Sequence, residues 1–298
     1  MLNRLVVGVD GTDAAARALD WAAATVGPKG AVHCVAAASP MIEFGVDVIT
    51  GDPVGYLAFL EGHLAGDWTR RVVDRVAECT VELREQHASQ ALIEAAVEVG
   101  ADGIVIGSHH HRALSVGVIG RTTRGLLRQL PTALIVVPEE AQHGLGSDGP
   151  VVVGVGHGEA TEGSVWWATQ LADDRDLPIG LIRATGDAPV FQSNGLLDVL
   201  GYYLSPAERE QWTTREVARF AHAVQENSDR ALSVDVDVRP GLPAVELVEA
   251  SRSAGLLVVG QHWSAISRGH QVSQPLRYLL GHAAGVVAVV PEAAVHVP

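Results

Sequence analysis

Short apolar runs alternate with stretches of helical periodicity along the whole chain. Runs of about four to eight apolar residues between turn signals are typical of strands buried on both faces. In the first half they predict strands at residues 5–9, 31–38, 80–84, 104–107 and 133–137. Helical spacing predicts helices from Asp13 to about Val26, from a loop at 40–56 to about Glu78, from Ser89 to Val99 and around Thr122–Gln129. This alternation predicts a parallel, doubly wound α/β sheet.

The second half of the chain repeats the first. Residues 6–22, VVGVDGTDAAARALDWA, align without a gap with residues 152–168, VVGVGHGEATEGSVWWA. Near the ends of the two halves, ALIVVP (133–138) matches VVAVVP (286–291). A repeat of about 150 residues has the size of a whole domain. The chain is therefore interpreted as a tandem duplication, in which each proposed site can be compared with its counterpart.

The duplication predicts two domains joined by a linker. The first domain is expected over residues 1–138 and the second over 151–298. The stretch 139–150, EEAQHGLGSDGP, is polar and glycine-rich, which is typical of a linker. The second domain should repeat the order of elements, with strands at 151–155, 179–183, 234–238, 256–260 and 286–290.

Composition narrows the classes of partner. The chain has 298 residues, of which 47% are hydrophobic, and a net charge of −14. The acidic balance argues against general binding of nucleic acid. No apolar run reaches the roughly 18 residues of a membrane span, and the start, MLNRLVVGVD, lacks the regions of a signal peptide. These features predict a cytoplasmic protein with no nucleic-acid or membrane partner, in which Cys34 and Cys79 are buried free thiols.

Acidic residues are absent from the same part of both halves. Residues 103–138 and 250–291 contain no Asp or Glu. The first of these stretches carries Arg112, Arg121, Arg124 and Arg128, and the second carries Arg252, Arg268 and Arg277. A locally positive corner suits a small anion. Buried strand and loop would exclude acids equally well, so both interpretations stay open.

Motifs at the two ends of the first domain carry a family resemblance. They are VVGVDGT at 6–12 and GADGIVIGSHHHRALSVGVIGRTTRGLLRQLPTALIVVP at 100–138. With their weaker echoes in the second half, they make the chain similar to universal stress proteins of the tandem two-domain type. The resemblance implies two Rossmann-like (flavodoxin-like) domains, each with a five-stranded parallel sheet in the order 3-2-1-4-5 and helices on both faces.

The resemblance also implies a ligand and a mode of association. Many members of the family hold ATP, here expected with Mg²⁺, in the crevice at the carboxyl ends of the strands, where open parallel sheets bind ligands. The family pairs subunits through its last strand. The segments ALIVVP and VVAVVP would then join the two domains as an internal pseudo-dimer, because such an edge must be paired rather than left open. A homo-oligomer is expected as well.

ATP-binding members resemble one another in a loop of the form G-x2-G-x9-G-S/T. Its glycines let the backbone approach phosphate, and amides at the following helix N-terminus donate to it. In the first domain Gly107 and Gly120 hold the first and third glycine positions, whereas His110 replaces the second and Arg121 replaces the Ser or Thr. The nucleotide site implied by the resemblance comprises Val9, Asp10, Gly11, Ala37, Gly107, His110, Gly120, Arg121, Thr122 and Thr123.

The second domain departs further from the pattern. Gly156 stands where Asp10 would contact the nucleotide. Trp263 and Ser273 replace two of the loop glycines, and Pro275 removes a backbone amide from the helix start. No nucleotide is therefore expected in the second domain.

Two functions remain open on the sequence alone. One is a non-enzymatic stress-response protein that binds ATP or another adenine nucleotide in the first domain only. The other is a nucleotide-free association module in which both sites have decayed. A side chain at His110 crowds a close phosphate, whereas Arg112, Arg121 and a protonated histidine would attract it.

Catalytic and metal sites are not predicted. The sequence has no P-loop and no positioned base, so no enzyme activity is expected, although slow hydrolysis of bound ATP stays open. His109, His110 and His111 are adjacent in a loop. Adjacent residues of an extended loop point to alternating sides, so a solvated loop is predicted there rather than a metal site.

Overall fold

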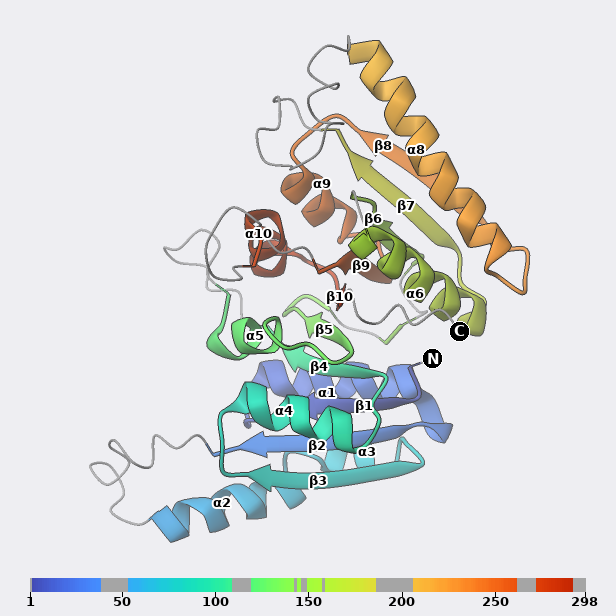
Figure 1. Ribbon diagram of the computed structural model, residues 1–298. Helices are drawn as coiled ribbons and strands as arrows, with labels where there is room; N and C mark the ends of the chain where they lie inside the picture. Colours follow the sequence, from blue (N-terminus) through green and yellow to red (C-terminus); the bar gives the residue numbers. More distant parts are fainter. Residues whose placement is uncertain are drawn as a thin grey trace. The chain divides into compact units, whose positions relative to one another are not determined.

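The computed structural model describes residues 2–38, 53–108, 119–141, 144–145, 149–156, 159–185, 206–261 and 272–291. They form two compact units, the first reaching Leu145 and the second starting at Gly149. Figure 1 shows the sheet of each unit with its flanking helices. Each unit has one five-stranded parallel sheet, which confirms the predicted fold class.

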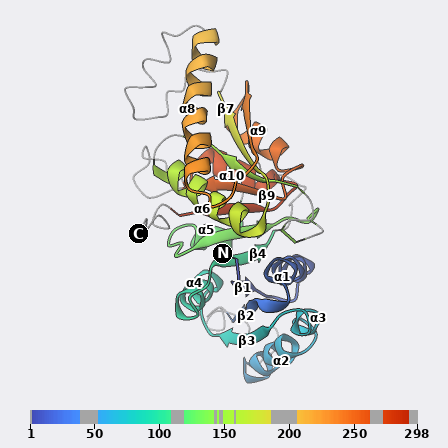
Figure 2. The ribbon, with the colours of Figure 1, turned by 90° about the vertical axis from the view of Figure 1, so that its right-hand side faces the viewer.

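The first unit has the strand order β3-β2-β1-β4-β5. Its strands are β1 (Arg4–Gly8), β2 (Ala31–Ala37), β3 (Glu78–Arg84), β4 (Gly103–Gly107) and β5 (Ala133–Val137). Its helices are α1 (Asp13–Val26), the 3-10 turn η1 (Gly27–Lys29), α2 (Pro53–Ala65), α3 (Arg70–Val73), α4 (Ala88–Glu98) and α5 (Arg121–Leu126). Figure 2 shows α1 and α3 on one face of this sheet and α4 on the other, which follows from right-handed crossovers.

The second unit repeats this order as β8-β7-β6-β9-β10. Its strands are β6 (Val151–Gly154), β7 (Ile179–Ala184), β8 (Val234–Arg239), β9 (Leu256–Gly260) and β10 (Val287–Val290). Its helices are α6 (Glu159–Arg175), α8 (Pro206–Glu226), α9 (Pro243–Ala250) and α10 (Gln274–His282). The contacts of α6 with α8 and of α9 with α10 correspond to the two helical layers of the first unit.

Helix α1 forms where the sequence predicts it. The Thr12 hydroxyl accepts a hydrogen bond from the Ala15 amide at 3.2 Å, which satisfies one of the free amides of the first turn. Ala18, Trp21 and Ala22 are buried against the sheet, as their helical spacing predicts. The linker is bound to the end of α1, because the Leu145 amide donates a hydrogen bond to the Thr25 hydroxyl at 3.1 Å.

The single helix predicted up to Glu78 is wrong, because the chain forms two helices with a turn between them. Helix α2 ends at Ala65, and α3 spans only Arg70–Val73. Gly66 follows the end of α2, where its lack of a side chain favours leaving the helix. The Thr69 hydroxyl then donates to the Leu64 carbonyl at 2.7 Å and stabilises the turn.

Candidate functional site

The carboxyl ends of β1, β2 and β4 meet at one edge of the first sheet. Gly8 pairs with Val35, and the Val9 amide donates to the Val35 carbonyl at 2.9 Å. Ala37 and Gly107 are the last residues of β2 and β4. The structure therefore brings together at this edge the predicted site residues that follow or end these strands: Val9, Asp10, Gly11, Ala37 and Gly107.

The turn after β1 is organised by Asp10. Its Oδ1 accepts hydrogen bonds from the Thr12 amide at 3.0 Å and from the Thr12 hydroxyl at 2.6 Å. Gly11 between them has a φ of 79°, a conformation that favours glycine. Asp10 is exposed, and its Oδ2 forms no hydrogen bond within the described chain. One carboxylate oxygen thus shapes the turn and the other remains able to accept from a ligand.

Trp68, from the turn between α2 and α3, packs directly on this site. A Cβ added to Gly11 would lie 2.5 Å from the Trp68 indole ring, so the ring rests on the Gly11 backbone. His63 stacks beside it, with ring centroids 5.9 Å apart. No sequence pattern points to Trp68, because it is far from Gly11 along the chain and no periodicity relates the two residues.

The packing of the first unit requires a glycine at position 107 but not at position 120. A Cβ at Gly107 would lie 2.2 Å from the Ala14 carbonyl oxygen, so this glycine allows α1 to cross the end of β4. A Cβ at Gly120 would meet only the Thr123 hydroxyl, at 3.7 Å. Packing therefore explains Gly107 without any ligand, whereas nothing in the described surroundings of Gly120 excludes a side chain.

The start of α5 is basic, and no side chain caps it. Gly120 is its N-cap residue and offers no side-chain acceptor to the amides of the first turn. Arg121, Arg124 and Arg128 are exposed and form no ion pair with any residue that the structure describes. Figure 1 shows α5 on the side of the first unit toward which the β2 and β3 arrows point. His110 and Arg112 lie outside the described residues.

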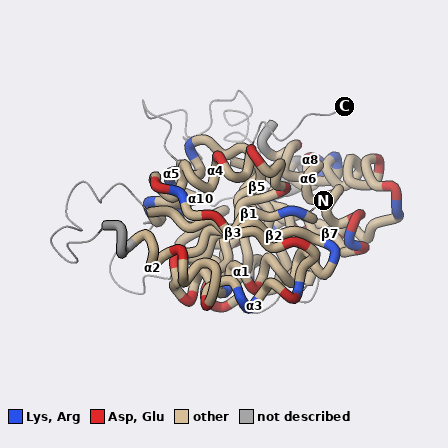
Figure 3. The backbone as a smooth tube through the Cα atoms, turned by 90° about the horizontal axis from the view of Figure 1, so that it is seen from below, with Lys and Arg blue, Asp and Glu red and all other residues tan. Residues whose placement is uncertain are grey.

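These arginines stand out against the acidic chain as a whole. Lys and Arg number 21 and Asp and Glu number 35. Figure 3 shows blue and red positions interspersed over the described parts of both units. A stretch with arginines and no acids, such as the one that contains α5, is therefore a local exception.

The corresponding places in the second unit are filled by the protein's own groups. The Ser273 hydroxyl accepts from the Leu276 amide at 3.4 Å and so caps α10 itself, and Pro275 lacks an amide. Gly156, at the position of Asp10, has no carboxylate, and its amide donates to the Thr161 hydroxyl at 3.1 Å. His157 and Trp263 lie outside the described residues.

A buried arginine, which the sequence analysis did not single out, lies at the same edge of the second unit. Arg183 is only 9% exposed, and its Nη1 donates to the Val155 carbonyl oxygen at 2.9 Å. Its Nη2 lies 4.0 Å from the Glu216 carboxylate. In the first unit the corresponding position is the small Ala36, so the long side chain of Arg183 is specific to the second unit.

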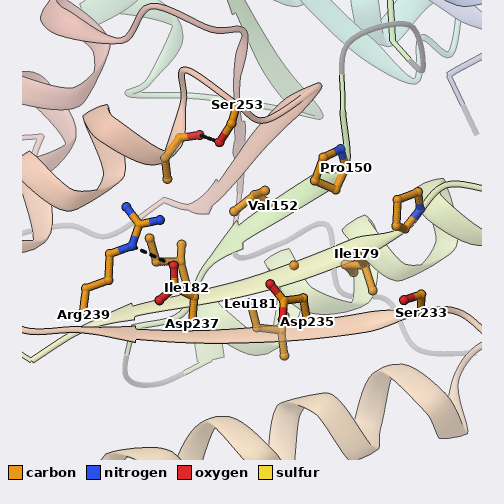
Figure 4. Close-up of a pocket in the computed structure, with 13 residues that line it drawn as sticks. Pro150, Val152, Ile179, Leu181, Ile182, Ser233, Asp235, Asp237, Arg239 and Ser253 are labelled. Atoms are coloured by element: carbon orange, nitrogen blue, oxygen red, sulfur yellow. Dashed lines mark hydrogen bonds and ion pairs between the residues drawn. The ribbon is translucent and has the colours of Figure 1, made fainter.

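A hollow of about 250 Å³ lies on the sheet face of the second unit, bordered by β6, β7 and β8 (Figure 4). It extends toward Pro150 and Pro178 before the amino ends of β6 and β7, so it is not the counterpart of the carboxyl-edge site. Gly180 in β7 leaves this space open. In the first unit His33 holds the same register position and bonds to Glu82 at 3.0 Å.

Among the described residues, no three His, Cys, Asp or Glu side chains lie close enough together to hold a metal ion. The described helices include none with the length and apolar character of a membrane span.

Comparisons with known proteins identify the first domain and the fold. The model of the universal stress protein family matches residues 1–138. The chain is 28% identical over 111 residues to Universal stress protein Rv2028c of Mycobacterium tuberculosis, a match that covers 37% of this chain and 36% of that protein. Most of that relative's length is therefore not matched by this chain.

Solved structures resemble the whole chain in fold. A universal stress protein from Archaeoglobus fulgidus has a TM-score of 0.68 at 10% identity, covering 98% of this chain and 99% of its own. A putative universal stress protein from Pseudomonas aeruginosa has a TM-score of 0.56 at 14% identity, with 98% and 95% covered. Residues 1–138 thus match the universal stress protein family, and the chain as a whole shares the fold of these solved structures.

Proposed function

We propose that this chain is a stress-response protein that binds ATP or another adenine nucleotide, with Mg²⁺, in its first domain only. The observation that carries the proposal is the start of α5. Among the residues that the structure describes, Gly120 has open space around it, contributes no side-chain cap to the helix, and precedes exposed arginines that form no ion pair. Free amides and unpaired guanidinium groups are the donors that phosphate oxygens need.

The other proposed contacts lie at the carboxyl edge of the first sheet. Asp10 would accept from the nucleoside through Oδ2, since Oδ1 is held by Thr12. Val9 and Ala37 would border the base at the ends of β1 and β2. The Trp68 indole, resting on Gly11, adds an aromatic surface beside them. Thr122 and Thr123 would contribute backbone amides, and Arg121 charge, to the phosphates.

The restriction to the first domain rests on what fills the second. Ser273 caps α10 in the place where an anion would bind, and Pro275 lowers the number of amides. Gly156 supplies no carboxylate, and Arg183 bonds across the end of β6. The second domain is proposed to hold no nucleotide, and no catalytic role is proposed for either domain.

Calorimetric titration of the nucleotide-free protein with ATP and Mg²⁺ tests this function. One site per chain is expected. Gly120→Val should weaken binding by about tenfold or more, because a side chain would occupy the phosphate approach, while its Cβ would make only an ordinary contact with the Thr123 hydroxyl, at 3.7 Å. Asp10→Asn should also weaken binding, because the amide keeps an oxygen for Thr12 but loses the charge.

Two controls give this titration its specificity. Ser273→Gly removes the α10 cap and costs about 1 kcal/mol of stability or less, but ATP binding should be unchanged. Binding should alter tryptophan fluorescence in the wild type, and less so in Trp68→Phe. Equal affinity in Gly120→Val, Asp10→Asn and the wild type would show that the site is elsewhere. No heat at all would favour the association module.

Association through the last strands remains a prediction. β5 and β10 are each the last strand of their sheet, and every residue of both is buried. β3 and β8, at the opposite ends of the sheets, carry exposed residues. Burial of β5 and β10 supports the view that their edges are covered rather than open.

Amide hydrogen exchange tests this association without altering the chain. Every amide of β5 and β10 should be protected like those of β1 and β4, because a paired edge leaves no free N–H groups. In β3 and β8, every second amide points away from the neighbouring strand and should exchange faster than the amides of β5 and β10. Fast exchange of alternate amides in β5 would show an open edge.

A further inference from the structure

Two free thiols lie side by side in the first domain. Cys34 is in β2 and Cys79 is at the start of β3. The register pairs Val32 with Cys79 and Cys34 with Val81, so the two cysteines are diagonal neighbours on one face of the sheet. The two side chains lie close enough that a hydrogen bond between their sulfur atoms shifts the pKa of both. They are also the only two cysteines of the chain.

The two thiols differ in access to solvent. Cys34 is fully buried, as predicted. The prediction that Cys79 is buried is wrong, because β3 is the edge strand of this sheet and leaves Cys79 partly exposed. A small oxidant can therefore reach the Cys79 sulfur, whereas it reaches Cys34 only after the strand moves.

The hydrogen bond makes the exposed thiol the more reactive one. Because the Cys34 thiol donates to the Cys79 sulfur, it lowers the pKa of Cys79 to about 7. Donating this hydrogen bond raises the pKa of Cys34, and burial of the thiol raises it further. At neutral pH a substantial share of Cys79 is thus thiolate, the nucleophilic form of cysteine.

Packing alone does not require these thiols. The register of the second domain places Leu181 at the position of Cys34 and Val234 at the position of Cys79. The same fold thus accepts two aliphatic residues there. In the first domain two polarisable, oxidisable atoms lie in contact instead.

We propose that Cys79 and Cys34 form an oxidant-sensitive dithiol, which a hydroperoxide converts to an intramolecular disulfide between β2 and β3. The Cys79 thiolate attacks one peroxide oxygen, so that the O–O bond breaks and an S–O bond forms. Sulfur is oxidised to sulfenic acid, and the peroxide is reduced to hydroxide, or an alkoxide, which takes up a proton. The Cys34 thiol then attacks this sulfur, forming the S–S bond and releasing water.

The location of the pair suits such a reaction. Closing the bond requires the sulfur atoms to move from hydrogen-bonding to bonding distance. Within its sheet β3 is paired with β2 alone and can shift more readily than a central strand. The product would tie this edge strand covalently to β2, and a dithiol reductant would reverse it by exchange.

Peroxide treatment of the reduced, full-length protein tests the proposal. The wild type should lose two hydrogen atoms by intact mass and both alkylatable thiols, and a digest should contain the Cys34–Cys79 linked peptide. Cys34→Ala should stop at Cys79 sulfenic acid, trapped by dimedone. Cys79→Val, which copies Val234 of the second domain, should slow the oxidation of Cys34 about tenfold or more.

Three results would overturn the proposal. They are a wild type that keeps both thiols under peroxide, a Cys79→Val variant that is oxidised as fast as the wild type, and a disulfide-linked dimer on a non-reducing gel in place of the internal bond. Circular dichroism of both variants confirms that they are folded. ATP titration is a separate measurement, so failure of the nucleotide proposal would leave this one unaffected.

Discussion

Replacing Gly107 with alanine should lower the free energy of unfolding of the first domain by about 2–3 kcal/mol. The new Cβ would lie 2.2 Å from the Ala14 carbonyl oxygen and 2.3 Å from its carbon. Both are backbone atoms of the first turn of α1, so no side-chain rotation relieves the overlap. The helix must move away from β4, which it covers, and loses buried contacts. Urea unfolding followed by circular dichroism measures the loss.

Gly120→Ala is the matched control for this substitution. Its Cβ would meet no atom of the described residues nearer than 3.7 Å, and its φ of −56° suits any residue. Its stability should therefore change by no more than about 0.5 kcal/mol. A Gly107→Ala protein as stable as Gly120→Ala would show that α1 does not lie where the structure places it.

Arg84→Met should be the second large effect, with a loss of about 2 kcal/mol. Arg84 is only 12% exposed and holds three carboxylates together. Its Nε lies 2.7 Å from Glu82 and its Nη1 3.5 Å from Glu94, and its Nη2 bonds to Glu98. Removing the guanidinium leaves three negative groups near one another at the edge strand, partly relieved by solvent. Thermal or urea unfolding gives the magnitude.

The second domain supplies the control for Arg84. Arg239 holds the same register position in β8 and bonds to Asp237 at 2.7 Å and Glu246 at 3.7 Å. It is 30% exposed and has fewer partners, so Arg239→Met should cost less than about 1 kcal/mol. Equal losses in both variants would contradict a special role of the Arg84 network.

This network should also make the first domain sensitive to acid. Partial burial raises the pKa of Glu82, but hydrogen bonds from Arg84 and His33 outweigh it and hold the pKa below its ordinary value of 4.5. A lowered folded-state pKa means that the stabilisation is present above the unfolded value and is lost as pH falls through the folded one. Urea midpoints should therefore drop below about pH 4.5, and less steeply in Arg84→Met than in the wild type.

Sequence patterns were sufficient for the fold because the fold depends on local and repeated signals. The strands β5 and β9 lie where the apolar runs predict them, and α1 begins at Asp13 after the Thr12 cap. Burial on both faces requires continuous apolar runs, and a cap requires a particular residue at a particular place. The prediction of one helix up to Glu78 was wrong because it ignored contacts between distant segments. The helix breaks near Gly66, and the turn that follows places Trp68 on Gly11.

The candidate site was only partly accessible to sequence reasoning. The glycine pattern pointed equally to Gly107 and Gly120, yet one is explained by the approach of α1 and the other is not. Trp68, Arg183 and the contact between Cys34 and Cys79 join segments that are distant along the chain. No periodicity encodes such pairs.

The sequence by itself determined the tandem α/β architecture and the loss of nucleotide-site residues in the second half. Its motifs resemble those of universal stress proteins, and that resemblance implied the strand order. The architecture and the lost residues follow from hydrophobic period, repeat alignment and residue type, which are properties of the chain itself. Only the tertiary structure decided which glycine is required by packing, which carboxylate oxygen of Asp10 is already bonded, and which thiol is exposed. Each of those depends on what another part of the chain places within a few ångströms, and sequence spacing carries no information about that distance.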